Sequence, residues 1–133
     1  MIIKGSKDPI DIEENSGILY LVHFNLEDKD LVKIGVTSRP IEERMAEVLK
    51  SIFKQYREFP FCRPKRFRKT ADVYEKEASL LKHFKNYSYT TEKKFSGSTE
   101  FVDAPLDEVV VVYEELVKGV ITYESLMGQP PYP

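Results

Sequence analysis

Cysteine and histidine are scarce in this sequence: Cys62 is the one cysteine, and His23 and His83 are the two histidines. A single cysteine excludes an internal disulfide and a zinc site made of several cysteines. Two histidines cannot complete a conventional zinc site without carboxylates. The lone cysteine therefore predicts a reducing compartment, the cytoplasm.

Long apolar runs are also missing. None approaches the roughly 18 residues that a membrane-spanning helix requires, and residues 1–15 have neither the apolar core nor the cleavage site of a secretory signal. We therefore expect no membrane partner. A length of 133 residues suits one domain with its own core. We predict a single domain over residues 1–133, with a proline-rich loose tail at 128–133.

Net charge is small, at −2, but the charges are unevenly distributed. Residues 33–98 hold sixteen Lys or Arg and eight Asp or Glu, whereas residues 1–32 hold three and seven, and residues 99–133 hold one and seven. A basic centre between acidic ends favours a polyanion as partner. The alternative is that folding mixes these charges and leaves no basic patch.

Two short apolar segments near the start are typical of paired strands. Residues 18–24 form an apolar run of aromatic and aliphatic side chains, which is typical of a strand. Residues 31–36 form a second run, and the polar residues 25–30 between them indicate a turn. We therefore predict an antiparallel hairpin, in which Tyr20 and Lys33 come near each other.

The rest of the sequence alternates helical patterns with shorter extended segments. Pro40, Glu42 and Glu43 favour the start of a helix, and apolar residues three and four apart continue it to Phe53. Thr70 suits the cap of a second helix. The remaining elements are an extended basic segment at 61–69, the second helix at 70–87, a short strand at 99–102 and an acidic helix at 105–118. The order β-β-α-β-α-β-α predicts an α+β sandwich, with about three helices flanking a small, mainly antiparallel central sheet.

A tyrosine beside a lysine suits proton transfer. A neighbouring ammonium favours the phenolate form of a tyrosine, and such a base can take a proton from water or from a hydroxyl. Chemistry on a phosphodiester would further need a cation on the phosphate and a metal near the leaving oxygen. Arginine binds phosphate through two parallel hydrogen bonds, and magnesium often takes only one or two protein carboxylates. Tyr20 and Lys33 are therefore candidates for such chemistry.

Five motifs, in order along the chain, resemble those of the GIY-YIG nuclease superfamily. They are Gly17-Ile-Leu-Tyr20, Lys33-Ile-Gly35, Ile41-Glu-Glu-Arg44-Met, Glu77-Ala-Ser-Leu-Leu-Lys-His-Phe84 and Gly97-Ser-Thr-Glu-Phe101. Lys-Ile-Gly as the second motif is similar to a phage and bacterial branch of that superfamily. The resemblance covers residues 17–102, a motif core that occupies most of the chain.

The resemblance implies a role for each of five residues. Tyr20 would be the general base or would position the attacking water, and Lys33 would tune Tyr20 or touch phosphate. Arg44 would stabilise the transition-state phosphate, and Glu77 would hold one Mg²⁺ or Mn²⁺ ion. Gly35 would let another group approach the backbone closely.

Several of these residues have competitors in the sequence. Arg44 could instead pair with a Glu of its own helix, and Arg39 is a rival cation in the preceding turn. Glu75 and Glu77 lie two apart and so point to different sides of a helix. The spacing from Glu77 to the apolar side of that helix favours Glu77. His83 is a further candidate for the site.

Cations and aromatics mix in the basic segment. Phe61 and Phe67 alternate with five cations, a pattern that suits a phosphate backbone and unstacked bases. The alternative is a solvated loop. Glu100 is expected only to hold the short strand in place, without a catalytic role. The predicted nucleic-acid-binding residues are Gly35, Arg39, Arg63, Lys65, Arg66, Arg68 and Lys69.

Together these features favour a phage or bacterial metal-dependent endonuclease that nicks or cleaves DNA in the cytoplasm, with RNA as an alternative partner. Val48 and Leu81 stand where related chains carry histidine, which favours a second hypothesis, a nucleic-acid-binding module without catalysis. The acidic helix at 105–118 favours a third, a phage-encoded factor that binds another protein. Since the motif core fills the chain, target specificity would come from loops, a homodimer or a protein partner.

Overall fold

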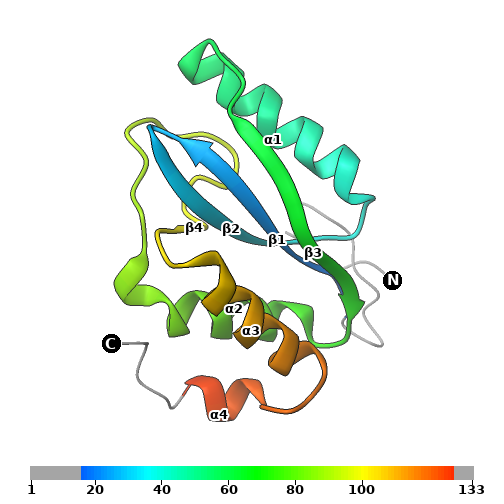
Figure 1. The fold of residues 1–133 in the computed structure, drawn as a ribbon. Coiled ribbons are helices and arrows are strands. Elements are labelled where there is room, and N and C mark those ends of the chain that lie inside the picture. The colour runs from blue at the N-terminus through cyan, green and yellow to red at the C-terminus, as the bar shows by residue number, and fades with distance from the viewer. Residues whose placement is uncertain (1–15, 128–133) are drawn as a thin grey trace.

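The computed structural model describes residues 16–127 (Figure 1). The predicted order β-β-α-β-α-β-α is confirmed, with a short 3-10 helix and a further helix in addition. The elements are β1 (Gly17–Leu26), β2 (Lys29–Thr37), α1 (Ile41–Tyr56), β3 (Phe61–Thr70), α2 (Val73–His83), η1 (Lys85–Tyr87), β4 (Phe101–Val102), α3 (Leu106–Val117) and α4 (Tyr123–Met127). The predicted loose tail at 128–133 lies outside the described residues.

One antiparallel sheet runs in the order β3-β1-β2-β4. The predicted hairpin of β1 and β2 is confirmed, and it places Tyr20 opposite Gly35 and Val22 opposite Lys33. Directly opposite residues share a face of the sheet, and so do residues two apart along a strand. Tyr20 and Lys33 therefore lie on the same face as diagonal neighbours.

The hairpin turn is tighter than predicted, because both strands continue through most of the polar segment between them. Glu27 and Asp28 form the turn, with φ values of 54° and 60°. Two consecutive positive φ values are characteristic of a type I′ turn, whose twist matches that of the flanking strands. The Glu27 carboxylate accepts hydrogen bonds from Tyr56 and, at 2.6 Å, from Tyr89, which ties the turn to α1 and to the segment after η1.

Helices cover both faces of the sheet: α1 lies on one side, and α2 and α3 lie on the other (Figure 1). The core on the α1 side joins Tyr20 and Phe24 to Val48, and the core on the α2 side joins Leu19 and Ile34 to residues of α2, α3 and α4. The predicted α+β sandwich is thus confirmed. Within residues 16–127, no helix is both long and apolar enough to cross a bilayer.

The start of the second helix differs from the prediction. Thr70, expected to cap that helix, is the last residue of β3 and pairs with Gly17. Because β1 offers a pairing partner along its whole length, the basic segment continues as a strand to this point. The helix α2 begins only at Val73, after Asp72. Its expected last turn, through Tyr87, is instead the 3-10 helix η1.

Candidate active site

Lys33 lies at the centre of the candidate site and is fully buried on β2. Its ammonium Nζ donates hydrogen bonds to Tyr20 Oη, 2.9 Å away, and to Glu100 Oε1, 2.7 Å away. Burial by itself lowers the pKa of Lys33, but Tyr20 and the Glu100 carboxylate outweigh burial and hold that pKa above its ordinary value. The lysine therefore stays charged, and a positive charge lies directly beside the Tyr20 hydroxyl.

Two glycines make room for this arrangement. A Cβ on Gly35 would overlap the ring of Tyr20, so the group that approaches this glycine closely is the tyrosine itself. Gly35 is buried beneath the ring and leaves room for it, and its contact with nucleic acid stays a prediction. A Cβ on Gly97 would lie 2.6 Å from Lys33 Cε and 2.8 Å from Nζ. The loop before β4 therefore passes directly over the lysine.

Glu100 reaches Lys33 because β4 pairs with β2. Phe101 lies opposite Lys33, and the backbone N–H of Ile34 donates to the Glu100 carbonyl at 3.0 Å. Glu100, which was expected only to hold the short strand in place, thus also supplies a carboxylate to the site. Its signal in the sequence is the run from Gly97 to Phe101, but that run does not show which strand it pairs with.

Glu77 on α2 forms a carboxyl pair with Glu100, and the two side chains share a hydrogen bond. Burial, followed by the charge of Glu100, raises the pKa of Glu77 to about 8, against the opposing effects of Lys33 and Arg44. Glu75 is exposed elsewhere on α2. The structure therefore brings Glu77, and not Glu75, to the cluster around the lysine.

Arg44 on α1 is almost fully buried and lies within electrostatic reach of Glu77. Its Nη1 donates to Glu47 Oε1, three residues further on, and lies 3.5 Å from Ser96 Oγ. Arg39 also pairs with Glu47, at 3.1 Å between Nη2 and Oε2. One carboxylate thus engages both Arg44 and its rival Arg39, and a phosphate would have to compete with it.

The cluster around Lys33 consists of Tyr20, Lys33, Arg44, Glu77 and Glu100. It is enclosed on the sheet side and reaches solvent through its carboxyl groups. Tyr20 is fully buried, whereas Glu77 is half-buried and 28% of the Glu100 side chain is exposed. The covering loop is attached to α1, because the backbone N–H of Ser96 donates to a serine hydroxyl of that helix at 2.9 Å. A ligand therefore meets the carboxyl edge first, and the tyrosine hydroxyl contacts water or substrate only after a local rearrangement.

His83 and the two positions where histidines are expected contribute to packing. His83 lies six residues after Glu77, about 9 Å further along α2, and meets the ring of Phe84 edge-on at 4.9 Å between centroids. Burial lowers the pKa of His83, which favours the neutral imidazole. Val48 is buried in the core on the α1 side, and Leu81 packs against the core on the α2 side.

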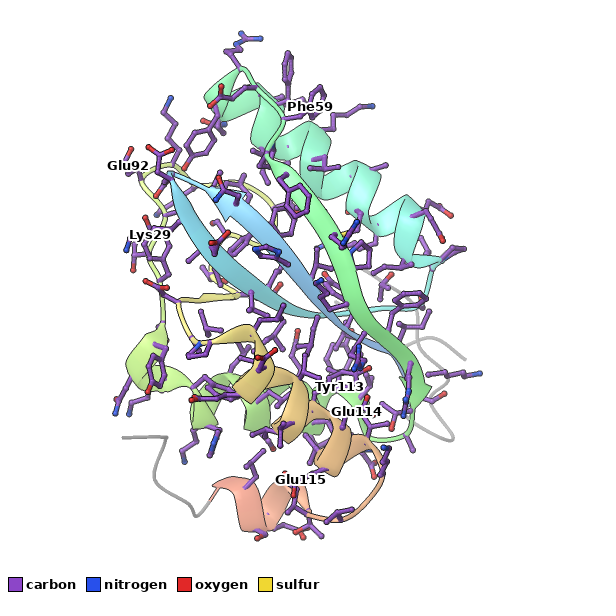
Figure 2. All side chains as sticks on the ribbon, viewed as in Figure 1. Lys29, Phe59, Glu92, Tyr113, Glu114 and Glu115 are labelled. Atoms are coloured by element: carbon purple, nitrogen blue, oxygen red, sulfur yellow. The ribbon has the colours of Figure 1, made fainter. Side chains whose placement is uncertain are left out.

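The basic segment forms the edge strand β3, and two of its arginines anchor it to α3. Arg66 and Arg68 pair with Glu114 at 3.1 and 3.3 Å, and Figure 2 shows Glu114 and Tyr113 on α3 beside β3. Tyr113 Oη donates to the Leu19 carbonyl at 2.6 Å and accepts from the backbone N–H of Arg68 at 3.1 Å. Contact of these arginines with nucleic acid stays a prediction.

The other cations of β3 are placed differently. Lys69 lies opposite Ile18 and so shares the face of the sheet that carries Tyr20, whereas Arg63 lies opposite His23 on the other face. Lys65 falls at an irregularity in the pairing. Within the described part of the chain, no salt bridge engages these three cations, so they are the cations of β3 most available to a polyanion.

The carboxyl pair fits a divalent cation. Two adjacent carboxyl groups share a proton more readily than both ionise, and a divalent cation could replace that proton. Mg²⁺ prefers oxygen ligands and often takes only one or two protein carboxylates. No group of three or more His, Cys, Asp or Glu with metal-binding placement occurs in residues 16–127. Glu77, with Glu100 beside it, could hold one ion whose other ligands would be water or substrate oxygens.

Comparison with known proteins gives a family but no individual relative. A family model for the T5orf172 domain matches residues 17–117. The match includes every residue of the cluster around Lys33. No curated protein and no solved structure matches the chain.

Proposed function

We infer, from the site and from the premise that the chain belongs to the T5orf172 domain family of phage-associated, nuclease-like domains, that this protein is a metal-dependent endonuclease of the GIY-YIG type. Its substrate is the phosphodiester backbone of DNA, which it nicks or cleaves. The observation that supports this most is the hydrogen-bonded row from Glu100 through Lys33 to Tyr20. It sets a charged ammonium against the Tyr20 oxygen that, as phenolate, would accept a proton.

Tyr20 is the proton acceptor in the proposed reaction. The Lys33 ammonium donates a hydrogen bond to Tyr20 Oη and stabilises negative charge there. As phenolate, Oη takes a proton from water while the water oxygen bonds to phosphorus and the bond from phosphorus to the leaving oxygen breaks. Glu100 keeps the ammonium charged and oriented, so it is a positioning residue.

Arg44 and Glu77 meet the remaining charge requirements of hydrolysis. Arg44 would exchange its contact with Glu47 for the non-bridging oxygens of the phosphate, which its planar guanidinium can bind in pairs. Glu77 would hold Mg²⁺ or Mn²⁺, an ion that when bound stabilises charge on the leaving oxygen. The residues from α1, α2, β1 and β2 thus supply complementary functions around one phosphodiester.

Plasmid nicking tests this assignment. With Mg²⁺ or Mn²⁺ the wild-type protein should convert supercoiled plasmid to the open circle, and a chelator should stop it. Glu77→Ala and Arg44→Ala should each slow nicking by about a hundredfold or more. Glu75→Ala is the matched control, since that carboxylate is exposed on the same helix, and it should cut as wild type. Activity that survives both Glu77→Ala and Arg44→Ala would overturn the site.

A nucleic-acid-binding module without catalysis is the second candidate. It is favoured by the full burial of Tyr20 and by the packing of Val48 and Leu81 at positions where related nucleases carry histidine. This candidate predicts DNA binding that weakens steeply with salt, with no cleavage in Mg²⁺ or Mn²⁺. Gel-shift and nicking assays on one preparation separate the two functions.

A further inference from the structure

Phe67 is an exposed aromatic side chain beside the candidate site. It lies on the edge strand β3 directly opposite Tyr20, which in turn lies opposite Gly35. The three residues form one row across the sheet, on the face that carries Lys33. Tyr20 is fully buried, whereas 51% of Phe67 is exposed. The row therefore runs from the interior of the site to a ring in contact with solvent.

A second phenylalanine on the same strand offers a matched comparison. Phe61 is 53% exposed but begins β3, where it pairs with Asn25 and meets the ring of His23 edge-on at 5.4 Å between centroids. Along the strand it lies about 20 Å from Phe67. The two rings thus have equal exposure and unequal distance from the site.

The charges around Phe67 favour an anionic partner. Lys69 lies two residues further on, shares the face of Phe67 and is exposed, and no salt bridge within residues 16–127 engages it. Arg68 turns to the other face and pairs with Glu114. An exposed ring next to an available cation has the make-up of a site for single-stranded nucleic acid, in which the ring stacks on a base and the cation meets the backbone. A contact of β3 with β3 of a second copy would instead set two basic strands side by side.

We propose that Phe67 stacks against a nucleobase next to the phosphodiester bound at Arg44, and that the protein prefers DNA with an unpaired base at that position. The location of the phosphodiester rests on the proposed function, and the inference adds the substrate class. A base inside a duplex is covered on both faces by its neighbours. Only a base that has left the stack can offer a face to Phe67.

A fluorescent oligonucleotide tests the stacking. The probe is a single-stranded DNA with one 2-aminopurine, moved through each position in turn and mixed with the full chain in chelator, so that binding proceeds without cleavage. Stacking quenches 2-aminopurine. Wild type should quench the probe at one position, and Phe67→Ala should lose that quenching and bind about tenfold or more weakly. Phe67→Tyr should retain both properties, and Phe61→Ala should behave as wild type.

Three results would overturn the proposal. The first is binding and quenching by Phe67→Ala that match wild type. The second is an equal loss in Phe67→Ala and Phe61→Ala. The third is a change from dimer to monomer in sedimentation of Phe67→Ala with unchanged oligonucleotide binding, which would assign the ring to a contact between two copies. Circular dichroism checks the fold of each variant, and Phe67→Leu, which keeps apolar bulk without an aromatic ring, replaces Phe67→Ala if that variant does not fold.

Cleavage is measured in a separate assay, so that the base-stacking proposal and the endonuclease proposal can be refuted independently. If wild type cuts no DNA in Mg²⁺ or Mn²⁺ but Phe67→Ala still loses quenching and affinity, the endonuclease is refuted and the base-stacking site stands. If wild type cuts DNA and Phe67→Ala quenches and binds as wild type does, the stacking site is refuted and the endonuclease stands.

Discussion

Gly97 and Gly119 have nearly the same positive φ in different surroundings, which makes them a matched pair of test positions. Their φ values are 82° and 79°. A Cβ on Gly97 would lie 2.6 Å from Lys33 Cε and 2.8 Å from its Nζ, whereas a Cβ on Gly119, just after α3, would meet nothing within 4 Å. Gly97→Ala therefore perturbs the lysine, and Gly119→Ala perturbs only the backbone.

The expected loss of stability differs between the two variants by the cost of displacing the lysine. Each alanine is held in the left-handed region, which costs about 1–2 kcal/mol, partly offset by about 0.4–1 kcal/mol from a stiffer unfolded chain. These two contributions are common to both positions. Gly97→Ala must also push a fully buried side chain aside, and overpacking of this kind costs about 1–3 kcal/mol more.

Urea unfolding of the two variants measures this difference, and nicking assays show whether the displacement reaches the active site. We expect Gly97→Ala to be less stable than Gly119→Ala by about 1–3 kcal/mol and to nick far more slowly under conditions where both are folded. Equal stability and equal activity of the two variants would refute the close passage of the loop over Lys33.

Three further perturbations follow from other parts of the structure. Burial and the neighbouring Glu100 raise the pKa of Glu77 to about 8 from 4.5, so the folded protein holds a proton that the unfolded chain releases. The free energy of unfolding of the metal-free protein should therefore fall as pH rises from 4.5 to about 8. Glu77→Gln should make this free energy less dependent on pH, which urea titrations at several pH values would measure. Glu47→Gln should tighten DNA binding about two- to fivefold in fluorescence anisotropy, because it removes the carboxylate that competes with phosphate for Arg44. Asp28→Gly should stabilise the protein by about 0.5 kcal/mol and so raise its melting temperature, because glycine adopts the φ of 60° at this position without strain. An unchanged or lower melting temperature would contradict this.

The sequence predicts those parts of the fold that depend on local pattern. Apolar runs on both sides of a polar segment predict the β1–β2 hairpin, and the hairpin brings Tyr20 and Lys33 together because its short turn leaves little freedom of register. Helical spacing likewise distinguishes Glu77 from Glu75, since residues two apart on a helix point to different sides. These predictions need no knowledge of distant contacts.

The parts that the sequence does not predict depend on pairing between distant segments. Glu100 meets Lys33 across 67 positions because the two-residue strand β4 docks on β2, and so short a strand leaves no pattern that identifies its partner. Thr70 continues β3 for the same reason, since pairing with Gly17 outweighs its preference for a helix cap. The pairing of Arg44 with Glu47, by contrast, is the local alternative that the sequence offers, and only the second contact of Glu47, with Arg39, was not predicted.

The central claim is that Oη of Tyr20, held by Lys33, acts as phenolate and takes the proton from water in DNA hydrolysis. Nicking rates of Tyr20→Phe and Tyr113→Phe test it most directly, because both tyrosines are fully buried and both hydroxyls are hydrogen-bonded, but only Tyr20 lies in the site. Tyr20→Phe should fold and should nick plasmid at least about a hundredfold more slowly than wild type, while Tyr113→Phe should lose stability and keep its rate when folded. A folded Tyr20→Phe that nicks at the rate of wild type would contradict the account.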